Sequence, residues 1–365
     1  MRLVLAAALA AAALSSSPAV AAEPPLKAGS VLHLTSKKHA HPYSLFVPSE
    51  YSAKVSWPVV ISSHGRDGSG KGEIGQWTGL AGKHGFIVAC PDMCTATVNR
   101  PPTSSLAPEA EDEQVLLSIF EEIASNFRVN RRAVMITGFS GGGNPSYWTG
   151  LRHPDVFTHI ATRGGNFAPQ QMPTDEKLLA AGRKRIQVYI YFGDNDHPLI
   201  LGEDGKPGQA QMAYDALKKA GYENLKFEKI AGMGHASRPD LAAGWFGAHL
   251  VANRKMFLAG DKADEMLAEI REGIAKERWK DAVRGLLELE KHEQKAGVPP
   301  VSGEVREKLT KVAADLVEQA KKAHEAGENG EANKLIGRVV RDFKGLAPHE
   351  EARGLEKEWK EPPPK

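Results

Sequence analysis

The chain reads Ala-Val-Met-Ile-Thr-Gly-Phe-Ser-Gly-Gly from Ala133 to Gly142, and this stretch decides the fold. Its first half is apolar and β-branched, as expected of a buried strand. Its second half, from Gly138 onward, fits the pattern G-x-S-x-G, in which a tight turn between a strand and a helix lifts a serine hydroxyl out of the sheet. A glycine-rich turn that only begins a helix would fit the same letters. The flanking chain therefore has to distinguish a reactive Ser140 from a structural one.

Apolar runs and amphipathic stretches alternate from residue 23 to about residue 260, with Gly, Pro, Asp and Asn between them. This alternation predicts an α/β fold, in which helices cover a mostly parallel sheet. Strands are expected at residues 43–47, 57–62, 86–89, 133–137, 159–162, 186–192 and 226–230. Helices are expected at residues 75–83, 111–127, 144–151, 208–219 and 240–258.

Two later loops carry the residue types that would activate Ser140. Asp196 follows the expected strand 186–192, and His235 lies on a glycine-rich loop after the next strand. The order Ser, Asp, His along the chain is that of the α/β-hydrolase fold. A serine hydroxyl is a weak nucleophile, so His235 is expected to act as general base and Asp196 to orient the imidazole. Asp194 competes for the acid role, and Asp196 is favoured because it reaches further toward the histidine loop.

Acyl transfer also requires two N–H donors that point at the developing oxyanion. One is expected from Gly141, directly after the serine, and one from Arg66 on the glycine-rich loop after the strand at 57–62. His64 begins that loop and is interpreted as a structural histidine, because the base is already assigned. The same loop, with Arg66 and Lys71, could instead form an anion-binding turn without catalytic meaning.

The composition changes abruptly after Gly260. Residues 261–365 hold 44 charged side chains among 105, and apolar residues recur there at spacings of three and four. This predicts a charged, all-α accessory region with breaks at Pro299 and Pro300. Sequence around Trp279 and Gly330 weakly resembles two helix pairs of tetratricopeptide type, and a plain helical bundle fits equally well. We expect such a region to dock a protein or envelope partner.

The first 22 residues and the net charge indicate the compartment and the partners. Arg2 precedes an apolar run that ends in small residues, which predicts a cleaved secretory signal and an extracytoplasmic protein, periplasmic or secreted. No later segment is long and apolar enough for a membrane span. A net charge of only +2 gives no reason to expect nucleic acid as a partner. An ester, small or polymeric, is the expected substrate.

The two cysteines, Cys90 and Cys94, are the whole cysteine content of the chain. In an oxidising compartment they could close a small disulfide ring. Their separation of only four positions, which includes a proline, makes the geometry demanding. Two thiols without a nearby histidine pair are too few for a metal site, so neither metal nor cofactor is expected.

The span from about Leu32 to Leu258 resembles the polyhydroxybutyrate-depolymerase, feruloyl-esterase and acetylxylan-esterase group of α/β-hydrolases. The resemblance rests on His41 to Pro48, His64-Gly65, Trp77, Gly85 to Pro91, Gly138 to Gly142, the Asp196 loop and His235. It implies the hydrolase sheet, two-step ester hydrolysis through an acyl-enzyme, and no cofactor. Residues 94–105 and 198–208 show no pattern that indicates one substrate, and the C-terminal helices are not part of the minimal family.

Two other functions fit part of the sequence. A peptidase of prolyl-oligopeptidase type shares the serine turn and the residue order, but such enzymes usually carry a large N-terminal propeller or cap, for which only about ten residues are available here. A non-catalytic envelope interaction protein could use the same fold as a shell. All three residue types of a triad are present, which favours an enzyme.

Overall fold

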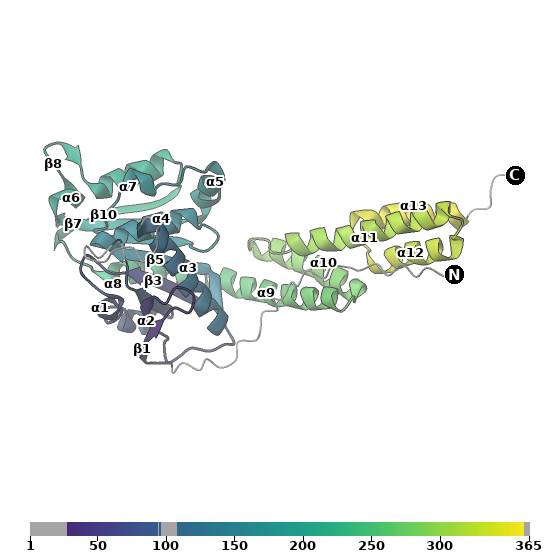
Figure 1. Cartoon of the computed structure of the whole chain (residues 1–365), viewed down its shortest axis with the longest axis horizontal. Helices are drawn as coiled ribbons and strands as arrows, with labels where there is room; N and C mark the ends of the chain where they lie inside the picture. The colour runs from purple at the N-terminus through teal and green to yellow at the C-terminus, as the bar shows by residue number, and fades with distance from the viewer. Residues whose placement is uncertain (1–27, 94, 96–107, 361–365) are drawn as a thin grey trace. The chain divides into compact units, whose positions relative to one another are not determined.

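The computed structural model describes residues 28–93, 95 and 108–360, which form two compact units that divide between Phe257 and Leu258 (Figure 1). The expected signal segment, residues 1–22, and Cys94 lie outside the described residues. Cys90 is a free, buried thiol whose pKa is raised by burial. Within the described ranges, no helix is both long and apolar enough to cross a membrane.

The first unit is built on an eight-stranded sheet with the order β1-β2-β4-β3-β5-β6-β7-β10. The six strands from β4 to β10 in this order are parallel, whereas β2 runs antiparallel to β4 and to β1. The sheet is therefore mostly parallel, with an antiparallel edge. The strands are β1 Val31–Thr35, β2 Pro42–Phe46, β3 Trp57–Ser63, β4 Ile87–Pro91, β5 Val129–Phe139, β6 His159–Arg163, β7 Gln187–Asn195 and β10 Asn224–Gly234.

Helices cover both faces of this sheet, so its central strands are apolar on both sides. In β3, for example, Val59 and Ile61 belong to the core under one helix layer, and Val60 belongs to the core under the other. One layer contains α3 Pro108–Asn126, α4 Gly143–Arg152, α5 Glu176–Arg185 and α7 Gln209–Lys219. The other contains α1 Gly70–Ile74, α2 Thr78–His84 and α8 Pro239–Ala252.

The structure differs from the sequence-based expectation in several elements. The helix expected at 75–83 corresponds to α2, and the short helix α1 before it was not expected; the helix expected at 240–258 ends at Ala252 before α9 begins at Arg254. Strand β1 was not expected, because it is a half-exposed edge strand with few buried residues. Helix α5 was missed because it buries only Gly182. The patternless segment after Asp196 forms α6 Pro198–Leu201 and a hairpin of β8 Gly202–Glu203 and β9 Lys206–Pro207.

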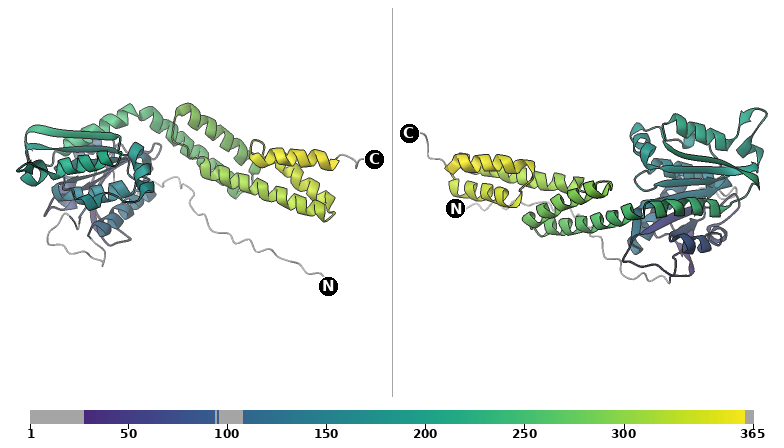
Figure 2. Two further views of the ribbon diagram at one scale, coloured as in Figure 1. Left: turned by 90° about the horizontal axis from the view of Figure 1, so that it is seen from above. Right: turned by 180° about the vertical axis from the view of Figure 1, so that it is seen from behind.

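The second unit is all-α and has its own apolar core (Figure 2). Its helices are α9 Arg254–Ala275, α10 Trp279–Ala296, α11 Gly303–Glu325, α12 Asn329–Asp342 and α13 Ala347–Lys360. The first turn of α9 belongs to the other unit, because Phe257 is buried in the core beneath α8. Trp279 of α10 stacks on Phe343, which follows α12, with ring centroids 5.9 Å apart.

Two helix hairpins, α9–α10 and α11–α12, repeat the same structure. The N–H of Arg278 bonds to the carbonyl of Gly273, and the N–H of Glu328, 50 residues later, bonds to the carbonyl of Ala323, both at 2.8 Å. This spacing is longer than the roughly 34 residues of a tetratricopeptide repeat. Buried residues recur at the same spacing: Ala263 and Ala313, Leu267 and Val317, Ile270 and Ala320, Ala282 and Ala332, Leu286 and Ile336, and Leu289 and Val339.

Candidate active site

Ser140 occupies a strained turn between β5 and α4. Its φ is +51°, in the left-handed region that non-glycine residues rarely adopt, and such strain is typical of functional turns. The flanking glycines are required by space: a Cβ on Gly138 would lie 1.9 Å from the carbonyl oxygen of Gly142, and one on Gly142 would lie 2.5 Å from that of His64. The G-x-S-x-G pattern thus corresponds to a turn that only these small residues permit.

Asp196 and His235 meet at the ends of neighbouring parallel strands. An irregularity in β10 brings Gly234 opposite Asn195, the last residue of β7. His235 directly follows Gly234, and Asp196 directly follows Asn195. The Nδ1 of His235 lies 2.6 Å from Oδ1 of Asp196. Because a carboxylate only accepts, Nδ1 donates and Nε2 keeps its lone pair in the neutral imidazole.

The two members of this pair differ in their exposure to solvent. The side chain of Asp196 is 1% exposed and that of His235 is 35% exposed, so the acid is shielded while the base can be reached. Asp196 Oδ1 also accepts the N–H of His197 at 2.7 Å. A second carboxylate, Asp194, is exposed and accepts the N–H of Gly232 at 2.8 Å, which ties it to the backbone near the end of β10 and not to the imidazole.

Contacts with the segments around Ser140 place it beside the Asp–His pair. The ring of Phe139 lies against that of His235, with centroids 4.8 Å apart. Gly164, directly after β6, lies against the Asp–His pair. A Cβ there would lie 3.0 Å from Oδ2 of Asp196 and 3.4 Å from Nδ1 of His235. The three residues expected to form a triad therefore gather at the carboxyl edge of the parallel strands.

The glycine-rich loop after β3 passes the serine at Gly65. A Cβ on Gly65 would lie 3.5 Å from the Cβ of Ser140. His64 fixes this loop: its Nδ1 bonds to the carbonyl of Gly65 at 2.7 Å, and its Nε2 accepts the N–H of Met93 at 2.9 Å. This bonding agrees with a structural role for His64. Arg66 directly follows Gly65, and Gly141 directly follows Ser140. Their roles as oxyanion donors stay predictions.

Sequence reasoning did not single out Phe139, Gly164 or Arg163. Each acts through a contact between segments that are distant along the chain. The one local signal was available for Arg163, a cation at the end of a strand without other Lys, Arg, Asp or Glu residues and directly before two glycines. Among the described residues, no group of three or more His, Cys, Asp or Glu side chains could hold a metal ion.

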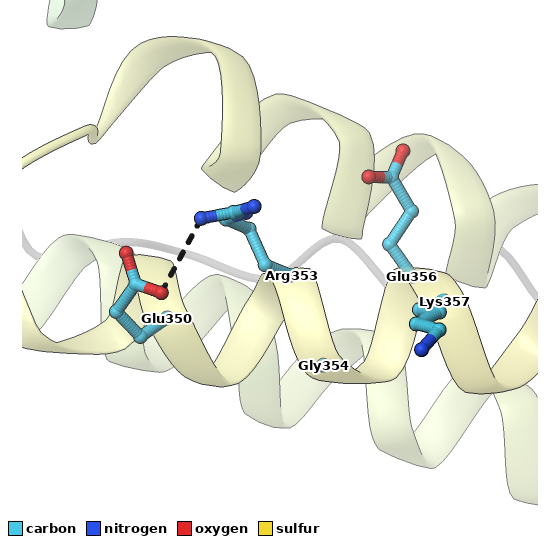
Figure 3. A pocket seen from close by; sticks show the side chains of 5 residues that line it. All are labelled: Glu350, Arg353, Gly354, Glu356 and Lys357. Carbon is cyan, nitrogen blue, oxygen red and sulfur yellow. Dashed lines mark ion pairs between the residues drawn. The ribbon is translucent and has the colours of Figure 1, made fainter.

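A surface hollow lies elsewhere, on α13, as Figure 3 shows. Glu350 and Arg353 form an ion pair across 3.5 Å at its rim. Its lining is charged and largely exposed, without the apolar wall that ligand sites usually have. We assign no function to this hollow, which is lined by Glu350, Arg353, Gly354, Glu356 and Lys357.

A mostly parallel sheet whose fifth strand ends in a strained serine, with an Asp–His pair two and three strands further along the sheet, defines the α/β-hydrolase class. The Esterase family model matches residues 37–228, which is more than half of the chain. The chain therefore belongs to the Esterase family. The matched span contains Ser140 and Asp196, and His235 follows it.

Several solved structures resemble part of this chain. A ferulic acid esterase is 18% identical, with 60% of this chain and 95% of that chain covered and a TM-score of 0.47. A ferulic acid esterase of Anaeromyces mucronatus is 16% identical, with 60% and 87% covered and a TM-score of 0.45. An S-formylglutathione hydrolase of Staphylococcus aureus is 14% identical, with 60% and 98% covered and a TM-score of 0.47. No curated protein matches the chain. At such low identity these likenesses say nothing about the substrate.

Proposed function

We propose that this protein is an exported serine esterase that hydrolyses carboxylic esters through an acyl-enzyme. The observation that carries the proposal is the 2.6 Å bond between Nδ1 of His235 and Asp196, beside a serine held at a positive φ. Membership of the Esterase family supports the same reaction class. The substrate class we propose is an acyl group linked to a polysaccharide, or a polyester.

The proposed reaction has two steps. In the first, Nε2 of His235 takes the proton of Ser140 while Oγ attacks the ester carbonyl, and the imidazolium that forms is stabilised by Asp196. The backbone N–H groups of Gly141 and Arg66 would stabilise the oxyanion. His235 then gives its proton to the leaving alcohol, which departs and leaves the acyl group on Ser140. In the second step, His235 takes a proton from a water that attacks the acyl carbonyl. The bond to Ser140 then breaks, the acid is released, and His235 returns the proton to Oγ.

Export and docking belong to the same proposal. The signal pattern in residues 1–22 supports export, and a mature chain that begins at Glu23 would be found outside the cytoplasm. The repeated helix hairpins α9–α10 and α11–α12 support an accessory role for the second unit, because stacked helix pairs commonly present extended binding surfaces. We propose that these helices dock a protein or envelope partner.

A fluorophosphonate probe tests the nucleophile without knowledge of the substrate. The mature protein should be labelled, Ser140→Ala should not be, and Ser125→Ala should be labelled like the wild type, because Ser125 is an exposed serine whose Oγ bonds to Glu122 and Asn126 of its own helix. Labelling that persists in Ser140→Ala would refute the assignment. Absence of labelling in the wild type would favour the non-catalytic shell.

A substrate panel then separates an esterase from a prolyl-oligopeptidase-like peptidase. The panel contains short p-nitrophenyl esters, methyl ferulate, acetylated xylan and a peptide amide, each assayed with the wild type and Ser140→Ala. We expect Ser140-dependent hydrolysis of esters and none of the amide. Faster cleavage of the amide than of every ester would overturn the proposed reaction class.

A further inference from the structure

A buried ion pair lies beneath the site, between Arg163 at the end of β6 and Glu73 in α1. The Nη2 of Arg163 lies 2.7 Å from Oε1 of Glu73, and their side chains are 0% and 3% exposed. Burial alone would raise the pKa of Glu73, but the charge of Arg163 and several hydrogen bonds hold it below its ordinary value. Glu73 is therefore ionised at neutral pH, beside a guanidinium, a group that proteins do not deprotonate. Burying two charges is costly unless their remaining hydrogen bonds are satisfied, so the partners of this pair are informative.

On one side, the pair holds the start of the glycine-rich loop. Nη2 of Arg163 donates to Oγ of Ser62 at 3.0 Å and to the carbonyl of Ser63 at 3.2 Å. The Ser62 hydroxyl in turn donates to Glu73 at 2.7 Å, as does the indole N–H of Trp77 at 2.9 Å. Ser62 and Ser63 are the last residues of β3, directly before the loop that passes Ser140.

On the other side, the same guanidinium is bonded to the histidine loop, residues 235–238 between β10 and α8. Its Nη1 donates to the hydroxyl of Ser237, two residues after His235. Arg163 also directly precedes Gly164, whose backbone lies below the Asp–His pair. One rigid, planar group is thus bonded to the segment that carries the expected base and to the strand end that leads to Arg66, one of the two expected oxyanion donors.

We infer that Arg163, charge-balanced by Glu73, is a positioning residue that fixes the histidine loop relative to the glycine-rich loop. This inference rests on the proposed serine esterase function. Arg163 does not touch the reacting atoms and acts through Ser237 and through the end of β3. Its N–H groups have a fixed fork geometry, so they set a distance and an angle between the two loops, which a flexible ammonium would not do.

The test removes only the bond to the histidine loop. Ser237→Ala deletes the hydroxyl that Arg163 donates to, and Ser237→Thr restores a hydroxyl as the conservative variant. The control is Ser118→Ala, which likewise deletes a hydrogen-bonded hydroxyl; Ser118 is buried and bonds to Ser36 and to the carbonyl of Val115, whereas Ser237 is half-buried. Arg163→Lys serves as a second probe, because it keeps the charge that Glu73 requires but loses the fork.

In steady-state hydrolysis of a short p-nitrophenyl ester, Ser237→Ala should lower kcat by about tenfold to a hundredfold with little change in KM, since small displacements of a catalytic group cost rates of that order. Ser237→Thr should recover most of the loss, and Ser118→Ala should keep the wild-type kcat. Arg163→Lys should resemble Ser237→Ala. A Ser237→Ala variant with wild-type kcat, or a loss equal to that of Ser118→Ala, would overturn the inference.

A second measurement does not depend on turnover. The proton between His235 and Asp196 should give a downfield 1H NMR signal in the wild type, which broadens in Ser237→Ala because the loosened loop exposes it to exchange with water. The signal should stay sharp in Ser118→Ala. If the wild type hydrolyses no ester, the proposed function fails, whereas an unchanged signal in Ser237→Ala refutes the positioning role by itself.

Discussion

Asp196 and Asp194 are two carboxylates at the end of one strand, and their replacement by asparagine gives a sharp comparison. Asp196 lies 2.6 Å from Nδ1 of His235, so Asp196→Asn removes the charge that stabilises the imidazolium and disturbs the tautomer. We expect kcat to fall by about 10³- to 10⁴-fold, the loss seen when the acid of such a triad is neutralised. At 1.36 kcal/mol for each factor of ten, this is about 4 to 5 kcal/mol of transition-state stabilisation.

Asp194→Asn should have a much smaller effect. Its carboxylate is exposed and accepts the N–H of Gly232 at 2.8 Å, a bond that an amide oxygen can replace. We expect kcat within about fivefold of the wild type, since a typical hydrogen bond contributes about 1 kcal/mol net and 1.36 kcal/mol corresponds to a factor of ten.

The assay is initial-rate hydrolysis of a short p-nitrophenyl ester, with circular dichroism and a melting curve for each variant to confirm folding. Both substitutions replace one carboxylate oxygen with an amide nitrogen and keep the size of the side chain nearly the same. Each therefore controls for the other. The reasoning fails if Asp194→Asn is the more harmful change, because the exposed carboxylate would then be the orienting acid.

Three further results are expected. A chain truncated after residue 260 should fold and hydrolyse a short ester nearly as fast as the full mature chain, because the site and Phe257 of its core are retained; a folded but inactive product would show that the helices complete the site. Burial holds the pKa of His159 well below its ordinary value, so on acidification the unfolded chain binds a proton that the folded chain excludes. The free energy of unfolding should therefore fall from pH 7 to pH 5, by up to about 1.4 kcal/mol per pH unit for this group, and urea titrations of His159→Asn should show a shallower fall. Ester hydrolysis should rise with pH, because only a neutral imidazole can accept the proton of Ser140, and it should survive EDTA; loss on chelation that a divalent ion restores would indicate a metal-assisted reaction instead.

Local patterns in the sequence were enough to predict the class of fold and the serine turn. Apolar runs of strand length, separated by glycine and aspartate, predicted the parallel sheet because each buried strand needs a continuous apolar stretch. The turn around Ser140 was predictable because its pattern is local, and Gly138 is required by the carbonyl of Gly142, four residues later; that Gly142 is required by the carbonyl of His64 became clear only from the structure. Elements with little burial, such as β1 and α5, carried no such signal and were missed.

Only the tertiary structure decided which groups meet. Asp194 and Asp196 are chemically alike and two residues apart, and the pairing of β10 with β7, including its irregularity before Gly234, determines that Asp196 bonds to His235. The partnership of Arg163 with Glu73 and Ser237 joins segments 90 and 74 residues apart along the chain. Side-chain identity fixes what a group can do, but distances between remote segments arise from strand order and packing, which no local pattern contains.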